Sequence, residues 1–208
     1  LLSFFLNFSL LNAQTTWTGN TDSDWSKASN WTAGVPDAND RAIILNVAND
    51  PVIMTGTNAI AQSVIVQSGK LIIESMASLK IDNSTGYGFE NRGTVQNYGK
   101  IKIGTTTLVN GHGLRNSSHF HNKSGGKIII DKCLEDGINN ARVFNNNAGA
   151  EIKIDDAHGN GFNNNTNGST PGKLNNSGKI IIGANKKPGL TGLRNSGGDV
   201  INSPSGII

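Results

Sequence analysis

Three aspartates in the second half of the chain are the residues whose type and spacing come closest to an active site. Asp131 and Asp155 each directly follow a short isoleucine-rich run, and Asp156 comes next to Asp155. Paired carboxylates can hold calcium, as they do in enzymes that cleave uronate polymers, or they can serve as acid and nucleophile in glycoside hydrolysis. These three residues therefore form a candidate acidic or metal site.

A simpler interpretation of the same aspartates is that they are solvated turn residues. Lys132 and Lys153 lie nearby in the sequence and can offset their charge. The equivalent positions of other repeats hold Gly104 and Gly183, so acidic residues are not a feature of the repeat. We favour this interpretation and expect no catalytic residue and no cofactor.

Histidine and cysteine offer little further chemistry. His119 and His121 lie two residues apart on a predicted strand, so both face the same way, and paired imidazoles can bind zinc. No third ligand has a suitable spacing, so we expect surface imidazoles. Cys133 is the single cysteine, which excludes an intrachain disulfide, and it has no catalytic partner pattern. We expect a buried or half-buried free thiol.

The elements that must position these residues form a sequence repeat. An apolar residue, any residue and Asn make a triplet that occurs twice in each repeat, and the first Asn advances by 25, 24, 24 and 31 residues. Short β-prone runs separate the repeats, namely Lys100–Ile103, Lys127–Ile130, Glu151–Ile154 and Lys179–Ile182. Self-similarity at a fixed period is typical of a solenoid, and about 24 residues provide three short strands and three turns per coil.

Stacking of these coils predicts two ladders of asparagine side chains. Residues i and i+2 of a strand share a face, so the apolar residue and the Asn of each triplet both point inward. Equivalent Asn residues then lie about 4.8 Å apart and can hydrogen-bond, which avoids a cost of roughly 1–3 kcal/mol for each unpaired buried group. The first predicted ladder is Asn91, Asn116, Asn140, Asn164 and Asn195. The second is Asn97, Asn122, Asn146, Asn176 and Asn202.

The same register predicts columns of apolar side chains in the interior. One predicted column is Phe89, Leu114, Ile138, Phe162 and Leu193. Another is Ile101, Ile128, Ile152 and Ile180. An insertion from Asn165 to Gly172 interrupts one coil, and we expect it to be a projecting polar loop.

All three tryptophans, Trp17, Trp25 and Trp31, lie before the first repeat. They are suited to cover the open end of a solenoid, which otherwise exposes apolar side chains and unpaired backbone groups. The alternative interpretation is a platform on which sugar rings stack. The motifs around them read W-T-G, D-W, N-W and G-x-P, the last ending at Pro36.

This tryptophan-containing opening resembles the N-terminal motif of large secreted bacterial repeat proteins of the autotransporter and adhesin-like type. The motif covers about 25 residues, and the Asn-Gly repeats that follow match these families loosely. The resemblance implies a right-handed parallel β-helix with an N-terminal cap and a location outside or on the outer surface of a bacterial cell. It implies a structural or adhesive role and no catalytic residues.

Charge and the chain ends narrow the function further. The net charge of +3 is small, and the Lys and Arg residues are spread along the repeats, which argues against a nucleic-acid-binding surface. Residues 1–13 are apolar and end in a small residue, which is typical of a secretory signal and too short to span a membrane. Ser205–Ile208 matches the start of another repeat strand, so we expect the chain to be truncated and to continue beyond residue 208.

These observations divide the chain into a partial signal (1–13), a cap (14–40), irregular first coils (41–85) and regular coils of the same β-helix (86–208). The predicted function is a non-enzymatic secreted or cell-surface scaffold with an adhesin-like role, and its candidate partners are carbohydrates or host-surface ligands. One alternative is a polysaccharide-active β-helix enzyme, a lyase or glycosidase, acting through Asp131 and Asp155. Another is self-assembly through an uncapped end.

Overall fold

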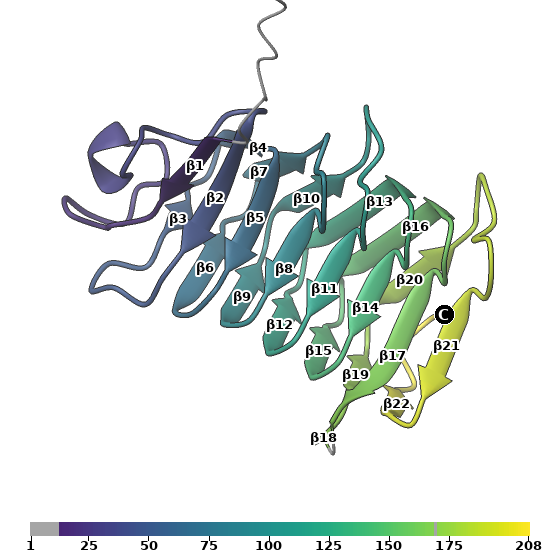
Figure 1. Ribbon diagram of the computed structural model, residues 1–208. Coiled ribbons are helices and arrows are strands. Elements are labelled where there is room, and N and C mark those ends of the chain that lie inside the picture. The colour runs from purple at the N-terminus through teal and green to yellow at the C-terminus, as the bar shows by residue number, and fades with distance from the viewer. Residues whose placement is uncertain (1–12, 169) are drawn as a thin grey trace, which may run out of the picture.

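Over the residues that the structure describes, the chain winds into a parallel β-solenoid, and each regular coil adds one strand to each of three sheets (Figure 1). The computed structural model describes residues 13–208 apart from residue 169. The predicted secretory signal therefore lies outside the described residues except for Ala13, which begins the first strand. The prediction of an all-β solenoid with coils of about 24 residues is confirmed.

Strands of successive coils pair in parallel, and each sheet is named here after its first strand. The β1 sheet contains β1 (Ala13–Thr16), β2 (Asp40–Ile44), β5 (Ser63–Val66), β8 (Phe89–Asn91), β11 (Leu114–Asn116), β14 (Ile138–Asn140), β17 (Phe162–Asn167) and β21 (Leu193–Ser196). The β3 sheet contains β3 (Val52–Ile53), β6 (Lys70–Ile73), β9 (Thr94–Asn97), β12 (His119–Asn122), β15 (Val143–Asn146), β19 (Lys173–Asn176) and β22 (Asp199–Asn202). The β4 sheet contains β4 (Asn58–Ala61), β7 (Ser78–Ile81), β10 (Lys100–Ile103), β13 (Lys127–Cys133), β16 (Glu151–Ala157) and β20 (Lys179–Ile182).

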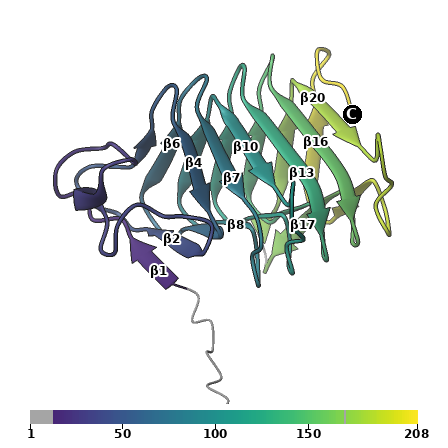
Figure 2. The same ribbon diagram turned by 90° about the horizontal axis from the view of Figure 1, so that it is seen from above.

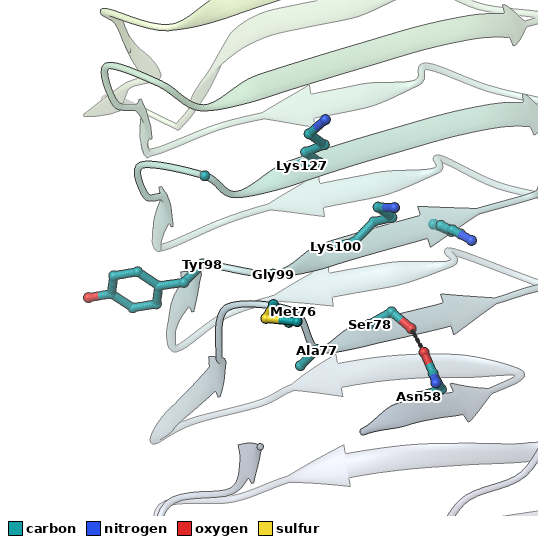
Figure 3. A pocket seen from close by; sticks show the side chains of 10 residues that line it. Asn58, Met76, Ala77, Ser78, Tyr98, Gly99, Lys100 and Lys127 are labelled. Atoms are coloured by element: carbon teal, nitrogen blue, oxygen red, sulfur yellow. Dashed lines mark hydrogen bonds between the residues drawn. The ribbon is translucent and has the colours of Figure 1, made fainter. Parts of the chain in front are cut away.

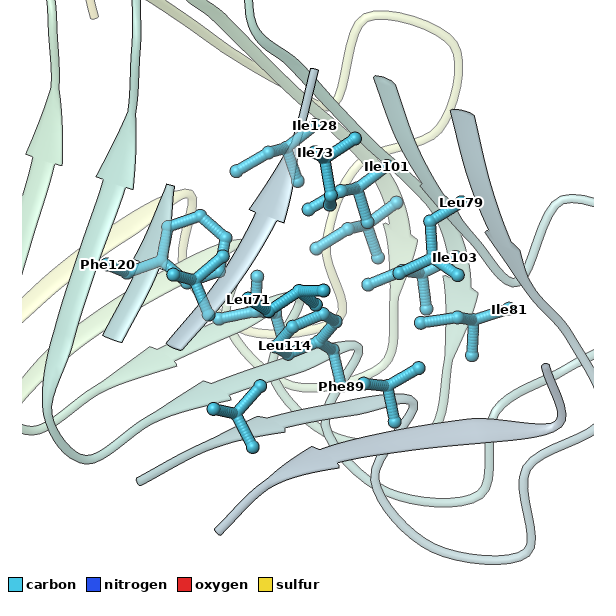
Figure 4. Close-up of a cluster of buried hydrophobic side chains, with 14 of the residues drawn as sticks. Leu71, Ile73, Leu79, Ile81, Phe89, Ile101, Ile103, Leu114, Phe120 and Ile128 are labelled. Carbon is cyan, nitrogen blue, oxygen red and sulfur yellow. The ribbon is translucent and has the colours of Figure 1, made fainter. Parts of the chain in front are cut away.

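Alternation along each strand buries every second side chain between the sheets. In β10, Ile101 and Ile103 are fully buried, whereas the lysines beside them are half-buried. Figure 4 shows side chains from the three sheets meeting in this interior. Both predicted apolar columns are in register. The first is Phe89, Leu114, Ile138, Phe162 and Leu193. The second is Ile101, Ile128, Ile152 and Ile180.

Aromatic contacts between coils reinforce these columns. The rings of Phe120 and Phe144 stack with centroids 4.8 Å apart and planes 4° apart. Phe144 then meets Phe162 edge-on at 5.6 Å. Each fully buried aromatic or aliphatic side chain contributes about 1.5–3 kcal/mol. Because each coil contacts only its neighbours, the stability of the whole is close to a sum of these inter-coil contacts.

Both asparagine ladders are present inside the solenoid. In the first, the Nδ2 group of each Asn donates to Oδ1 of the next at 2.7–3.0 Å, from Asn91 through to Asn195. The second runs from Asn97 to Asn202 at 2.7–2.9 Å. The donating amide groups also bond backbone carbonyls of the next coil, as Asn122 Nδ2 does to the carbonyl of Glu151. The ladders thus satisfy buried amides that could not reach water.

Each ladder has a direction, because every amide donates toward the later coil. At the start of the second ladder, Asn97 Oδ1 has no hydrogen-bond partner, since the register position before it is held by Ile73. At the far end, Asn195 and Asn202 are exposed and donate to carbonyls of their own coil. The inward position predicted for these two residues is therefore correct in register but not in burial.

The N-terminal end of the solenoid is covered by the segment that holds the tryptophans (Figure 2). Trp31 meets Trp17 and Trp25 edge-on, with ring centroids 5.0 and 4.6 Å apart. A short 3-10 helix, η1 (Ala28–Asn30), lies in the same segment. No helix in the described part of the chain is long and apolar enough to cross a membrane.

The insertion in the coil of β17 differs from the prediction of a polar loop. The strand continues to Asn167 and then pairs antiparallel with β18 (Thr170–Pro171). The register on either side is kept, because Asn164 still bonds Asn195 and Asn146 still bonds Asn176. The repeat pattern is interrupted at this insertion, so it predicts only a loop. The backbone of the insertion nevertheless continues the strand to Asn167 and forms an antiparallel pair.

Candidate functional site

The three candidate aspartates lie where two adjacent strands of the β4 sheet extend beyond their neighbours. Both β13 and β16 are seven residues long, whereas β10 is four. Their register pairs Lys132 with Asp156, so Asp131 and Asp155 occupy adjacent positions. These aspartates line a pocket of about 440 Å³ together with Lys153.

The carboxylate of Asp155 is held by groups of its own chain. Asn185 donates its backbone N–H to Oδ1 and its Nδ2 group to Oδ2, both at 2.9 Å. Lys153 Nζ lies 2.9 Å from Oδ2, and the Asp155 side chain is 6% exposed. Burial disfavours the charged form, but the bonds from Asn185 and Lys153 outweigh it and lower the pKa of Asp155. The residue is therefore a fixed anion with both oxygens occupied.

Asp131 and Asp156 have different surroundings. Burial raises the pKa of Asp131, and the charge of Asp155 raises it further. Asp156 forms an ion pair with Lys186 at 2.8 Å. Among the residues that the structure describes, no three or more His, Cys, Asp or Glu side chains converge in a way that could hold a metal ion. The acidic site thus offers one partly free carboxylate, Asp131.

The predicted histidine pair lies on the outer face of the β3 sheet. The rings of His119 and His121 are stacked, with centroids 6.4 Å apart. His121 Nδ1 lies 2.9 Å from Asn145 Nδ2, and Asn145 in turn accepts a bond from Asn175 at 2.7 Å. His121 therefore begins an outer row of side chains that hydrogen-bond from coil to coil. Burial lowers its pKa, and the charge of Lys123 lowers it further.

Cys133 is a free, fully buried thiol, as the sequence predicts. Burial raises its pKa to about 12, so the reactive thiolate is scarce at neutral pH. The site therefore contains no activated sulfur nucleophile at this position.

The sugar-platform interpretation of the tryptophans is wrong. Trp17, Trp25 and Trp31 are 1%, 1% and 5% exposed, so their faces cannot receive a ligand from solvent. Trp17 Nε1 donates to the carbonyl of Asn49, and Trp31 Nε1 donates to that of Trp25. These rings close the apolar interior instead.

A buried polar network that sequence reasoning missed surrounds Asp136. Its two carboxylate oxygens accept four N–H bonds of 2.7–3.0 Å, from the backbone and side chain of Asn160 and from the side chains of Asn139 and Asn163. Burial opposes ionisation, but these bonds outweigh it and lower the pKa of Asp136. The network joins two adjacent coils, because Asp136 and Asn139 lie in the coil of β14 and Asn160 and Asn163 lie in the coil of β17.

A second charged network lines a groove of about 530 Å³ on the β1 sheet. Glu90 is 5% exposed and pairs with Arg92 at 2.9 Å and with Arg115 at 3.5 Å. The Arg115 guanidinium lies 5.2 Å from the centre of the Tyr87 ring, which stacks on His112. A single buried carboxylate, that of Glu90, thus pairs with two guanidinium groups.

Lysines dominate a groove on the outer face of the β4 sheet, called here the lysine groove (Figure 3). Its volume is about 250 Å³. Lys100 lies in register with Lys127, and Lys102 with Lys80. The lining residues are Asn58, Met76, Ala77, Ser78, Tyr98, Gly99, Lys100, Lys102, Gly125 and Lys127.

Three of these lysines have no ion-pair partner. Lys80 is neutralised by Asp82 at 3.0 Å. Within the described part of the chain, no hydrogen bond or ion pair engages the ammonium groups of Lys100, Lys102 and Lys127. The groove therefore carries unbalanced positive charge.

This cluster corrects the expectation that basic residues are spread along the repeats. Lys100 and Lys127 are 27 residues apart in sequence but are paired on neighbouring strands. Strands of adjacent coils lie about 4.8 Å apart, so stacking gathers residues that a linear reading disperses. The signal was available in the runs Lys100–Ile103 and Lys127–Ile130, whose polar positions all face outward.

Comparison with known proteins places just over half of the chain in a family. Residues 16–122 match a family described as Domain of unknown function (DUF8693). The chain belongs to this family. No curated protein and no solved structure matches the chain significantly.

The DUF8693 match includes the tryptophan cap and the coils up to β12. It contains Tyr98, Lys100 and Lys102 of the lysine groove, whereas Lys127 lies beyond it. It does not reach Asp131 or the later aspartates. The DUF8693 segment and the coils after it share one continuous set of sheets, so the lysine groove is built by both.

Proposed function

We propose that this chain is a non-enzymatic scaffold, secreted or on the outer surface of a bacterial cell, with an adhesin-like binding or display role. The observation that carries the proposal is the contrast between its acidic and basic groups. Buried carboxylates are engaged by the protein itself, while lysines on an outer face are left unpaired. Such a surface is suited to binding a partner rather than to chemistry on it.

Catalysis by carboxylates requires a group that can reach the substrate. Asp155 has both oxygens occupied, and Asp136 accepts four N–H bonds. Glu90 is almost fully buried under Arg92 and Arg115. These contacts stabilise the fold, and breaking them to bind a substrate would leave buried donors unpaired.

The outer-surface location rests on the resemblance of the tryptophan opening to secreted repeat proteins. The absence of disulfides is compatible with this location, because the backbone ladders and the asparagine ladders supply the cohesion between coils. Antibody labelling and protease treatment of intact cells that make the protein test it. Surface labelling is expected, and labelling only after cell lysis would contradict the location.

The binding role is tested by measuring retention and turnover together. The purified chain is incubated with polygalacturonate and with a glycosaminoglycan, with and without calcium, and new reducing ends are counted alongside bound protein. We expect binding without new reducing ends. Turnover that disappears in Asp155→Ala would overturn the proposal.

A polysaccharide-active enzyme is the second candidate, and one observation favours it. The pKa of Asp131 is raised by burial and by the neighbouring charge, while that of Asp155 is lowered. Neighbouring carboxylates whose pKa values are driven apart are the usual arrangement of an acid and a base. Asp131→Asn separates the candidates, because it abolishes turnover by an enzyme and leaves a scaffold unchanged.

A further inference from the structure

We propose that the lysine groove binds an acidic polysaccharide, with carboxylate or sulfate groups on Lys100, Lys102 and Lys127 and a sugar ring against Tyr98. This inference rests on the proposed binding role and names the class of ligand. It is carried by the charge of the groove and by the groups that line it.

Like charges are placed unfavourably in the lysine groove. Lys100 and Lys127 are direct neighbours on adjacent strands, and like charges at such positions destabilise a sheet. Other outer positions of the solenoid hold neutral amides that bond to each other, as Asn145 and Asn175 do. A bound anion removes the repulsion, so the lysine pair is favourable in a complex and unfavourable without one.

The lysines of the groove have no counterion within the described part of the chain. The register partner of Lys127 on the next strand is Glu151, which is in turn followed by Lys179, but no ion pair joins Lys127 and Glu151 in the described residues. Lys80 already has Asp82. The three free ammonium groups are half-buried or exposed at the groove, so they can meet an anion without the cost of full desolvation.

Neutral groups suited to a sugar line the same groove. Tyr98 lines the groove, is 38% exposed and stacks on no other aromatic ring within the described part of the chain, so part of its side chain is open to solvent. Asn58 accepts a bond from Ser78 through Oδ1, which leaves its Nδ2 group available. Cations, an aromatic face and an amide donor together match a sugar polymer that carries both hydroxyl and anionic groups.

The shape of the groove also depends on a glycine. A Cβ atom at Gly99 would lie 2.3 Å from the Glu74 carbonyl and 2.5 Å from that of Ala77. Gly99 therefore lets the chain pass close to the preceding coil between Tyr98 and Lys100. Lys100 and Lys102 lie on β10, and Lys127 lies on β13 of the next coil, so the three ammonium groups are spread over two adjacent coils.

A nucleic acid is a weaker match. Nucleic-acid-binding domains are strongly basic, and their affinity comes from many phosphate contacts. This chain has a net charge of only +3, and Asp131, Asp155 and Asp156 lie on the same sheet as the lysines. Three cations over two coils are too few for the many phosphate contacts on which nucleic-acid affinity depends.

The test measures binding of the full chain to polygalacturonate, to dextran sulfate and to uncharged dextran. Lys100→Gln/Lys102→Gln/Lys127→Gln is compared with Lys123→Gln/Lys173→Gln/Lys187→Gln, which removes the same charge elsewhere. The groove variant is expected to bind about tenfold more weakly, as for the loss of three exposed ion pairs, with a smaller salt dependence. The control variant is expected to bind as the wild type does. Polygalacturonate against dextran sulfate distinguishes carboxylate from sulfate.

Several outcomes would overturn the inference. Equal weakening in both triple variants would show general charge attraction, and equal binding to dextran would show that anions are not recognised. Tighter binding to duplex DNA than to both acidic polymers would make the ligand a nucleic acid. If the wild type binds neither acidic polymer, the groove assignment fails and the display role stands. If it cleaves them, the proposed non-enzymatic function fails instead.

Tyr98→Ala provides a second measurement that does not alter charge. It is expected to weaken binding to polygalacturonate several-fold, by about the value of one stacking contact, while leaving the salt dependence unchanged. Thermal unfolding of each variant serves as the check on folding. Unchanged binding in a folded Tyr98→Ala variant would contradict the proposed contact between a sugar ring and Tyr98.

Discussion

The outer faces of the β3 and β4 sheets are built from the same repeat but behave differently. On the β3 sheet, Asn175, Asn145 and His121 form a row in which each side chain bonds to the next. On the β4 sheet, Lys100 and Lys127 occupy adjacent coils and can only repel. Where the same type of residue recurs on adjacent coils, amides hydrogen-bond to each other and lysines repel each other.

We expect the largest loss of stability from a substitution in the interior asparagine ladder, against which substitutions on the two outer faces can be compared. Asn140→Ala removes the acceptor of Asn116 and the donor to Asn164 and to the Arg142 carbonyl. The unpaired partners are buried, so we expect a loss of about 3 kcal/mol in the free energy of unfolding. Chemical denaturation measures it. Asn147→Ala is the control, since that side chain makes no hydrogen bond in the described structure, and a loss of similar size there would contradict the ladder's importance.

The Asp136 network should show as a pH dependence of stability. Burial opposes ionisation of Asp136, but its N–H bonds prevail, so the folded pKa lies below the ordinary value of 3.8. Its contribution is present above that value and is lost as the pH falls through the folded pKa. Asp136→Asn should lose about 2 kcal/mol at neutral pH and approach the wild type in acid. Denaturation midpoints from about pH 7 to about pH 3 follow the difference.

The stability contributed by Asp131 should depend on pH in the opposite direction to that of Asp136. Burial and the charge of Asp155 raise its pKa in the folded state. Its contribution is therefore full at low pH and is lost as the pH rises through the folded pKa. Asp131→Asn should be at least as stable as the wild type at neutral pH. A parallel response of the Asp131 and Asp136 variants to pH would show that these environments are misassigned.

The outer row of the β3 sheet should respond to the loss of one amide. Asn145→Ala breaks the bonds to His121 and Asn175, but solvent can reach these groups. We expect a loss of about 1 kcal/mol in thermal or chemical unfolding, smaller than that of Asn140→Ala. Equal losses at the two positions would remove the distinction between inner and outer amides.

The β4 sheet should give the smallest effect and the opposite sign. Lys127→Gln removes one of two neighbouring charges, so we expect a gain of about 0.3 kcal/mol in the free energy of unfolding at low salt. The gain should vanish in high salt, where the repulsion is screened. A clear loss of stability on this substitution would mean that Lys127 has a structural partner.

Much of the fold was predictable, because the repeat period fixes which residues stack. The ladder from Asn91 to Asn195 and the column beneath Phe89 follow from spacing alone. The adjacency of Asp131 and Asp155 also followed from the period. The partner of Asp155 did not, because Asn185 lies in a loop after β20 that the repeat does not describe.

The lysine groove was missed for a related reason. Counting charges along the sequence separates Lys100 from Lys127, and only the register brings them together. The Asp136 network depends on the lateral reach of Asn139, Asn160 and Asn163, which spacing cannot supply. Sequence periodicity thus predicted which equivalent residues stack on successive coils. It did not predict the hydrogen bonds between residues at non-equivalent positions of the repeat.

The antiparallel extension of β17 with β18 has a consequence for how such a chain can diversify. Here a coil has acquired extra residues at one corner, yet the amide bonds before and after it are intact. Cohesion between coils is thus decoupled from coil length. Additional residues can therefore be inserted at that corner while the hydrogen bonds between coils are kept. The corner is a suitable insertion site for engineered epitopes.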